Sequence, residues 1–221
     1  MERFQDWVRF LFDHPVHEPA WYWAADSEIE GWTADPSLTV GWMTHLFRQP
    51  SSLAPFSRDQ VSQGLWFLLG DSSPGDFGRQ LYEPEVDLGF RLECIRATPS
   101  FFVNYVAVHC ARPKPVHCAK DADALETACF MWWDLWPDRT GLHESGPDSD
   151  AVDSAVLDAL TAIAKLPSVA CVESALHGLA HRHARQAQRT EEIVSSLLRQ
   201  TSGWPVELVD YAEAAHRGMR L

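Results

Sequence analysis

The sequence lacks the short motifs that mark several common enzyme classes. Its 221 residues contain no GxSxG nucleophile elbow and no glycine-rich phosphate loop of the Walker or Rossmann type. Cysteine is scarce and scattered, with five residues and no CxxC pair of the kind that common zinc modules use. These absences give no support to a serine hydrolase, a nucleotide-binding enzyme or a zinc finger.

Long apolar runs are also missing, and acidic residues outnumber basic ones. No run approaches the roughly 20 apolar residues of a transmembrane helix, and the first residues are too polar for a secretory signal. Lysine and arginine number 18 against 31 acidic residues, and the net charge of −13 repels nucleic acid and anionic lipid. We therefore expect a reduced, cytoplasmic protein without a membrane or nucleic-acid partner. A helical nucleic-acid enzyme would need a basic groove, which the arginines and lysines after residue 111 could form, although the overall charge opposes it.

Apolar and aromatic residues are plentiful. Hydrophobic residues make up 46% of the chain and charged residues 22%, which is the composition of a folded globular protein. Ten tryptophans and eleven phenylalanines predict bulky aromatic packing between elements. We expect one domain over residues 1–221. Residues 137–150 are rich in Pro, Gly, Ser and Asp, so they predict a mobile loop or a sub-domain boundary.

Capping residues predict where several helices begin. Asp35 followed by Pro36 is a helix start, and Ser57 with Gln60 three residues later forms a capping box. The pair Thr98-Pro99 repeats the first pattern and predicts a new helix there. Helices are expected at about 3–12, 36–48, 58–69, 84–97, 98–110, 120–136, 151–166, 168–186, 190–201 and 205–217. No segment is a convincing strand.

The expected fold is all-α, built from stacked antiparallel helix pairs. In the last third, AVLDALTAIAKLPSVACVESALHGLAHRH reads as a helix, a Pro-containing turn and a second helix. This pattern resembles a HEAT-like unit over residues 150–218. The resemblance implies a right-handed superhelix with a concave binding face and usually no catalysis. An irregular helical bundle is the alternative architecture.

The helix at 168–186 carries an unusual number of histidines. Glu173, His177 and His181 are spaced four residues apart, so adjacent pairs can present oxygen and nitrogen to one metal ion. Zinc is the favoured ion. Gly178 stands where the HExxH metalloprotease motif needs its general-base glutamate, so that class is excluded. The three residues span about 80° of the helix, and one ion would need further ligands from another helix. The candidates for these ligands are His109, His117, His143 and Asp210.

The histidines also have a purely structural interpretation. In it His177 forms a hydrogen bond across a helix interface, Glu173 pairs with an arginine and His181 faces solvent. A second metal candidate is the repeated dipeptide His109-Cys110 and His117-Cys118, which could fold back into an S₂N₂ zinc site. Cys171 near a helix start is a candidate nucleophile with a lowered pKa.

The segment from Trp21 to Trp32 combines aromatic and acidic side chains. Trp21, Trp23, Trp32 and Glu28 suit a cationic or peptide ligand, so they form a candidate binding surface. The alternative is that the tryptophans only anchor a long loop to the core.

These features favour a non-enzymatic protein-binding module. Its acidic surface predicts a basic protein partner, and an inhibitor or immunity-type role fits its size and charge. The alternative function is a metal-dependent hydrolase that uses the histidine-rich helix 168–186.

Overall fold

The computed structural model describes residues 2–23, 32, 34–70, 77–82, 85–135 and 148–220. Over these residues the fold is all-α and contains no strand, as predicted. The α-helices are α1 (Glu2–Phe12), α2 (Pro36–Arg48), α3 (Arg58–Leu69), α4 (Leu88–Phe101), α5 (Ala107–His109), α6 (Ala124–Phe130), α7 (Trp132–Leu135), α8 (Ser149–Ile163), α9 (Val169–Leu198) and α10 (Val206–His216). Short 3₁₀ turns are η1 (Trp21–Trp23), η2 (Pro50–Leu53), η3 (Arg79–Tyr82) and η5 (Val116–Cys118), and η4 (Phe102–Val106) is a π-helix.

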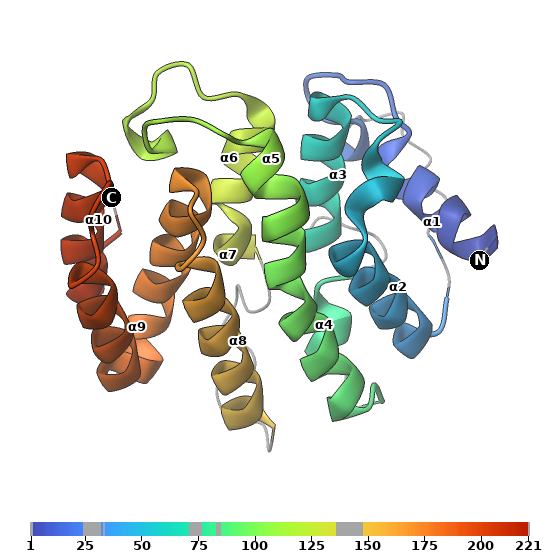
Figure 1. Ribbon diagram of the computed structural model, residues 1–221. Coiled ribbons are helices and arrows are strands. Elements are labelled where there is room, and N and C mark those ends of the chain that lie inside the picture. Colours follow the sequence, from blue (N-terminus) through green and yellow to red (C-terminus); the bar gives the residue numbers. More distant parts are fainter. Residues whose placement is uncertain are drawn as a thin grey trace.

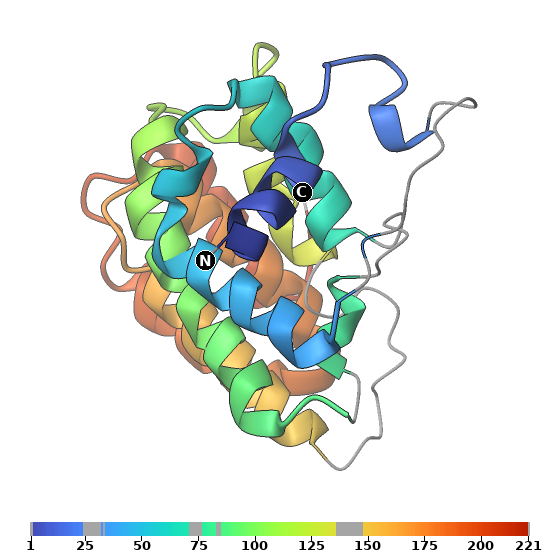
Figure 2. The ribbon, with the colours of Figure 1, turned by 90° about the vertical axis from the view of Figure 1, so that its right-hand side faces the viewer.

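The helices form two adjoining rows that meet at α9. One row runs α2, α4, α8, α9 and α10, each packed on the next (Figure 1). The other runs α1, α3, α6 and α9, with α7 packed between α3 and α9. Figure 2 shows these rows from the α1 end. Both rows therefore share α9. The HEAT-like character of the fold stays a prediction.

Two of the predicted helix starts are confirmed by their caps. The Asp35 carboxylate accepts hydrogen bonds from the N–H groups of Ser37 and Leu38, and α2 begins at Pro36. At α3 the reciprocal bonds between Ser57 and Gln60 complete the capping box. These local signals act within one turn, so they can be read without knowing the fold.

The predicted helix start at Thr98-Pro99 is wrong. The helix α4 begins after Asp87, runs through Pro99 and continues into the π-helix η4. Proline has no N–H to donate to the preceding turn, but Thr98 and the following Phe101 are buried in the core. Tertiary packing keeps this segment helical, and the helix widens into η4 three residues after the proline.

The predicted helix at 120–136 is shorter and divided. A second capping box, in which Asp123 and Glu126 bond each other's backbone N–H groups, starts α6 at Ala124. The helix ends at Phe130, and α7 follows after Met131. Residues 136–147 lie outside the described residues, and with them most of the loop predicted at 137–150.

The first half of α9 is enclosed on all sides. Every residue from Ala170 to Ala180 is buried, because α6, α7, α8, α10 and η4 all contact this helix. The histidine helix and the helix predicted at 190–201 are continuous except at Gln186, whose φ of −132° and ψ of 43° are not helical. None of the described helices, α9 included, has the length and apolarity needed to cross a lipid bilayer.

Gly178 lets α7 and α8 approach α9 closely. A Cβ atom placed there would lie 2.7 Å from Cγ of Trp133 and 2.6 Å from Cδ2 of Leu160. We expect Gly178→Ala to lower the free energy of unfolding by about 1–3 kcal/mol, because both neighbours are buried and cannot move freely.

The matched control is Gly41→Ala in α2, where the added Cβ meets no atom within 4 Å. Removing a helical glycine at that exposed site should raise the free energy of unfolding by up to about 1 kcal/mol. Urea denaturation of both variants measures the two effects, and a stabilised Gly178→Ala protein would contradict the close packing.

Candidate metal centre

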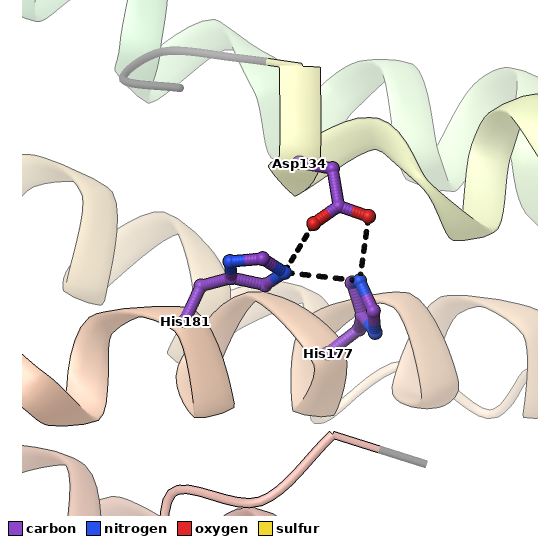
Figure 3. A group of neighbouring side chains, drawn as sticks. All are labelled: Asp134, His177 and His181. Atoms are coloured by element: carbon purple, nitrogen blue, oxygen red, sulfur yellow. Dashed lines mark hydrogen bonds and ion pairs between the residues drawn. The ribbon is translucent and has the colours of Figure 1, made fainter. Parts of the chain in front are cut away.

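Asp134 of α7 meets His177 and His181 of α9 (Figure 3). The Nε2 atom of His177 lies 2.9 Å from Oδ2 of Asp134, and Nε2 of His181 contacts Oδ1 of the same carboxylate. The two Nε2 atoms are 3.2 Å apart. One carboxylate and two imidazole nitrogens therefore converge on one small space between two helices.

These separations suit ligands of a single metal ion. Zinc binds imidazole nitrogen and carboxylate oxygen at about 2.0–2.2 Å, and two ligands on a tetrahedral ion are then about 3.3 Å apart. The distances of 2.9 and 3.2 Å are slightly shorter, and the contact between His181 and Asp134 is shorter still. Two histidines and one carboxylate also suit non-haem iron(II). A small outward shift of the three side chains would accommodate either ion.

Two consecutive tryptophans fix the position of Asp134. Trp132 is fully buried among aromatic rings, with its ring centroid 5.1 Å from that of Phe101 and 5.4 Å from that of Phe102. Trp133 packs against Gly178 of α9. With both rings held in the core, the next residue along the short helix α7 faces α9, so the carboxylate is placed by packing.

Tyr211 of α10 holds the other side of the His177 ring. Its hydroxyl lies 2.5 Å from Nδ1 of His177, and the ring of Phe130 lies 4.6 Å from the imidazole. Metal-binding histidines usually have a hydrogen-bond partner on the second ring nitrogen, which fixes the ring orientation. Tyr211 supplies that partner to His177, since a hydroxyl can both donate and accept.

The centre is partly accessible. The side chain of His177 is 6% exposed, whereas those of His181 and Asp134 are 22% and 21% exposed. Nδ1 of His181 lies 3.3 Å from Nη1 of Arg220. The group is therefore most exposed to solvent at His181 and Asp134.

The histidines keep Asp134 ionised. Burial by itself would raise the pKa of the Asp134 carboxyl, but hydrogen bonds from His177 and His181 and their charges lower the pKa well below its usual range. The Asp134 carboxylate is therefore ionised at any pH above about 4.

Zinc affinity should fall as the solution is made more acidic, because protons compete with the metal ion for the imidazole nitrogens. Asp134 does not cause this loss. Its pKa is lowered in the fold, so its ionised form is fully present above the unfolded value of about 4 and is lost only below it. Competition with a chromophoric chelator measures the profile. The Asp134→Asn control should weaken zinc binding at every pH without removing the pH dependence, and a flat wild-type profile would contradict imidazole ligation.

Glu173, the third residue predicted from the sequence, lies elsewhere. Its oxygens accept hydrogen bonds from the backbone N–H groups of Val116 and His117, at 2.7 and 2.9 Å, and one of them is 2.7 Å from Nδ1 of His117. It binds the start of η5 to α9. The structure brings His177 and His181 together as expected but joins them to Asp134 in place of Glu173.

The other predicted ligands are not part of this group. The ring of His109 packs on Tyr105 and that of His117 on Tyr211, Asp210 is exposed, and His143 lies outside the described residues. The two His-Cys pairs form no ligand cluster in the part of the chain that the structure describes.

All five cysteines are free thiols. Burial raises the pKa of Cys171 to about 11, and its thiol donates to the carbonyl of Phe102. The prediction that its pKa is lowered is therefore wrong, because desolvation outweighs the helix dipole. Cys171 is not an activated nucleophile.

The predicted binding tryptophans have different surroundings. Trp21 is buried and stacks on His14 with ring centroids 3.6 Å apart, and Trp32 is half-buried against the core. Trp23 is 61% exposed. Glu28 lies outside the described residues. Trp21 and Trp32 therefore act as anchors, and Trp23 is the one described member of this group that is open to a partner.

Sequence reasoning missed Asp134 and Tyr211. Asp134 is 43 residues from His177 and Tyr211 is 34 residues from it, so no local pattern links them. The weak signal for Asp134 is that it follows two tryptophans. Burial of both tryptophans places the next side chain at the edge of the core.

Comparison with protein-family models, curated proteins and solved structures finds no match for this chain. The class of site is therefore inferred from its own geometry.

Proposed function

We propose that this protein binds one divalent transition metal ion through Asp134, His177 and His181, and that it uses the ion in hydrolysis. Zinc is the ion that we favour. One observation carries the proposal: the two Nε2 atoms and the carboxylate converge at ligand separations. Asp134 supplies the negative charge, and Tyr211 orients His177.

The ligand set favours hydrolysis over a purely structural role. Structural zinc sites usually contain four protein ligands rich in cysteine, whereas catalytic sites commonly have three ligands drawn from histidine and carboxylate. A metal ion in such a site lowers the pKa of a bound water to about 7 and so supplies a nucleophile at neutral pH. The side chains of His181 and Asp134 are 22% and 21% exposed, so this position is open to solvent on one side.

Hydrolysis of p-nitrophenyl acetate and bis(p-nitrophenyl) phosphate tests the activity. Zinc-loaded protein should hydrolyse at least one of them, and chelation or Asp134→Ala should abolish the reaction. Zinc binding without hydrolysis of either ester would remove the enzymatic half of the proposal and leave a metal-binding protein.

A second candidate function, binding of a basic protein partner, is favoured by the outer face of α10. This helix ends the row, and it exposes Asp210 and Glu213 together with Val206, which is 67% exposed. The net charge of −13 would attract a basic surface. A cytoplasmic location belongs to the same proposal, because all five thiols are free.

A double charge reversal tests this second function. Asp210→Lys with Glu213→Lys should weaken binding of a partner captured from cell extract, and added salt should do the same. The matched control is Asp6→Lys with Asp13→Lys near α1, at the other end of the rows. Equal losses in both variants, or binding that is indifferent to salt, would contradict a role for α10.

A further inference from the structure

The chain after α10 returns to the histidines of α9. Gly218, with a φ of 70°, ends the helix in a Schellman turn, in which its N–H donates to Ala215 and the N–H of Met219 donates to Ala214. Gly218 also packs on His183, since a Cβ there would lie 2.6 Å from Nδ1 of that ring. This turn places Arg220 beside His181.

The contact between Arg220 and His181 fixes where the His181 proton lies. A guanidinium only donates hydrogen bonds, so Nδ1 of His181 must accept, at 3.3 Å from Nη1 of Arg220. In a neutral ring the proton is then on Nε2, which donates it to Oδ1 of Asp134. In this tautomer the Nε2 atom has no lone pair for a metal ion.

Coordination through Nε2 requires the opposite tautomer. The proton of a metal-bound His181 would be on Nδ1, where it would point at a cationic group that cannot accept it. His177 has no such conflict, because the Tyr211 hydroxyl at its Nδ1 can change from donor to acceptor. Of the two histidines, only His181 must lose its outer partner when a metal binds.

From this asymmetry we infer that Arg220 is a positioning residue that holds His181 in the metal-free tautomer, so that metal binding and the Arg220 contact exclude each other. The inference rests on the proposed metal centre. By reciprocity, any event that draws Arg220 away raises the metal affinity, and bound metal weakens the Arg220 contact by the same factor.

Zinc titration of the full chain tests the competition. Arg220→Ala should raise zinc affinity about two- to fivefold, the range expected for one exposed contact of a charged side chain. Arg220→Glu should raise it by about tenfold or more, because a carboxylate accepts from Nδ1–H of a metal-bound histidine. Arg220→Lys keeps a donor-only cation and should stay near the wild-type value.

Arg217→Glu is the matched control. This exposed arginine lies in the same turn, and no hydrogen bond or ion pair joins it to His181. An equal gain in Arg217→Glu and Arg220→Glu would show a general effect of charge and overturn the inference. An unchanged affinity in Arg220→Glu would overturn it as well.

The His181 tautomer separates this inference from the proposed function. Long-range ¹H–¹⁵N spectra of the metal-free protein should show the proton on Nε2 in the wild type and a shift toward Nδ1 in Arg220→Glu. That result holds even if zinc fails to bind, in which case the proposed function alone is wrong. A wild-type proton on Nδ1 in the metal-free protein would refute the role of Arg220.

Discussion

Replacing His177 with alanine is expected to lower zinc affinity by more than about a hundredfold. Changes to the outer partners of metal ligands already cost about 10–100-fold, and this variant removes a ligand that Tyr211 and Phe130 hold in place. Zinc competition against a chelator of known affinity measures the loss. Circular dichroism of the metal-free variant must first show that the helices are intact, because His177 is buried.

His183→Ala is the matched control for this experiment. His183 lies on the same helix and binds Glu191 at 3.0 Å, outside the centre. Its removal should change zinc affinity by no more than about fivefold, because it is not a ligand and can act on the centre only through the turn that carries Arg220. A similar loss in both variants would mean that zinc binds to the histidine-rich surface in general, and the Asp134 centre would then be rejected.

Glu173→Ala is expected to lower the free energy of unfolding by about 3 kcal/mol or more. The Glu173 side chain is 1% exposed, and the change leaves the backbone N–H groups of Val116 and His117 and the His117 ring without their acceptor. Each unsatisfied buried group costs about 1–3 kcal/mol. Urea denaturation in the presence of a chelator measures this loss without any contribution from bound metal.

Glu192→Ala on the exposed side of α9 is the comparison for Glu173→Ala. Glu192 accepts one hydrogen bond from Gln188, and its loss should change stability by less than about 0.5 kcal/mol. Under conditions where Glu173→Ala is folded, its zinc affinity should stay near the wild-type value. A large loss of zinc affinity with little loss of stability would show that Glu173 is a ligand.

Local signals in the sequence predict much of the fold. Helix starts at Pro36 and Arg58 follow from caps that lie within one turn of them. The error at Thr98-Pro99 shows the limit of such signals, because burial of the surrounding side chains keeps a helix intact where its backbone would favour a break. The enclosure of α9 could not be read from one helix either, since it depends on how five other elements pack around it.

The two histidines of the metal centre could be predicted from the sequence, whereas the carboxylate could not. The i, i+4 spacing of His177 and His181 places both rings on one side of α9 whatever else the chain does. The carboxylate that meets them depends on tertiary packing: Glu173 has the right spacing but turns to the backbone of η5, while Asp134 arrives through the tryptophans of α7. Helical spacing finds ligands on one helix and gives no information about a second helix.

X-ray absorption at the zinc edge tests the metal centre most directly. Tag-free protein loaded with one equivalent of zinc should show a first shell of nitrogen and oxygen at about 2.0–2.1 Å, with the outer-shell scattering of two imidazoles. Asp134→Ala should lose the bound ion or replace its oxygen with water. A sulfur shell near about 2.3 Å would place zinc on the cysteines. That result, or a chain that retains no zinc at all, would contradict the assignment of Asp134, His177 and His181.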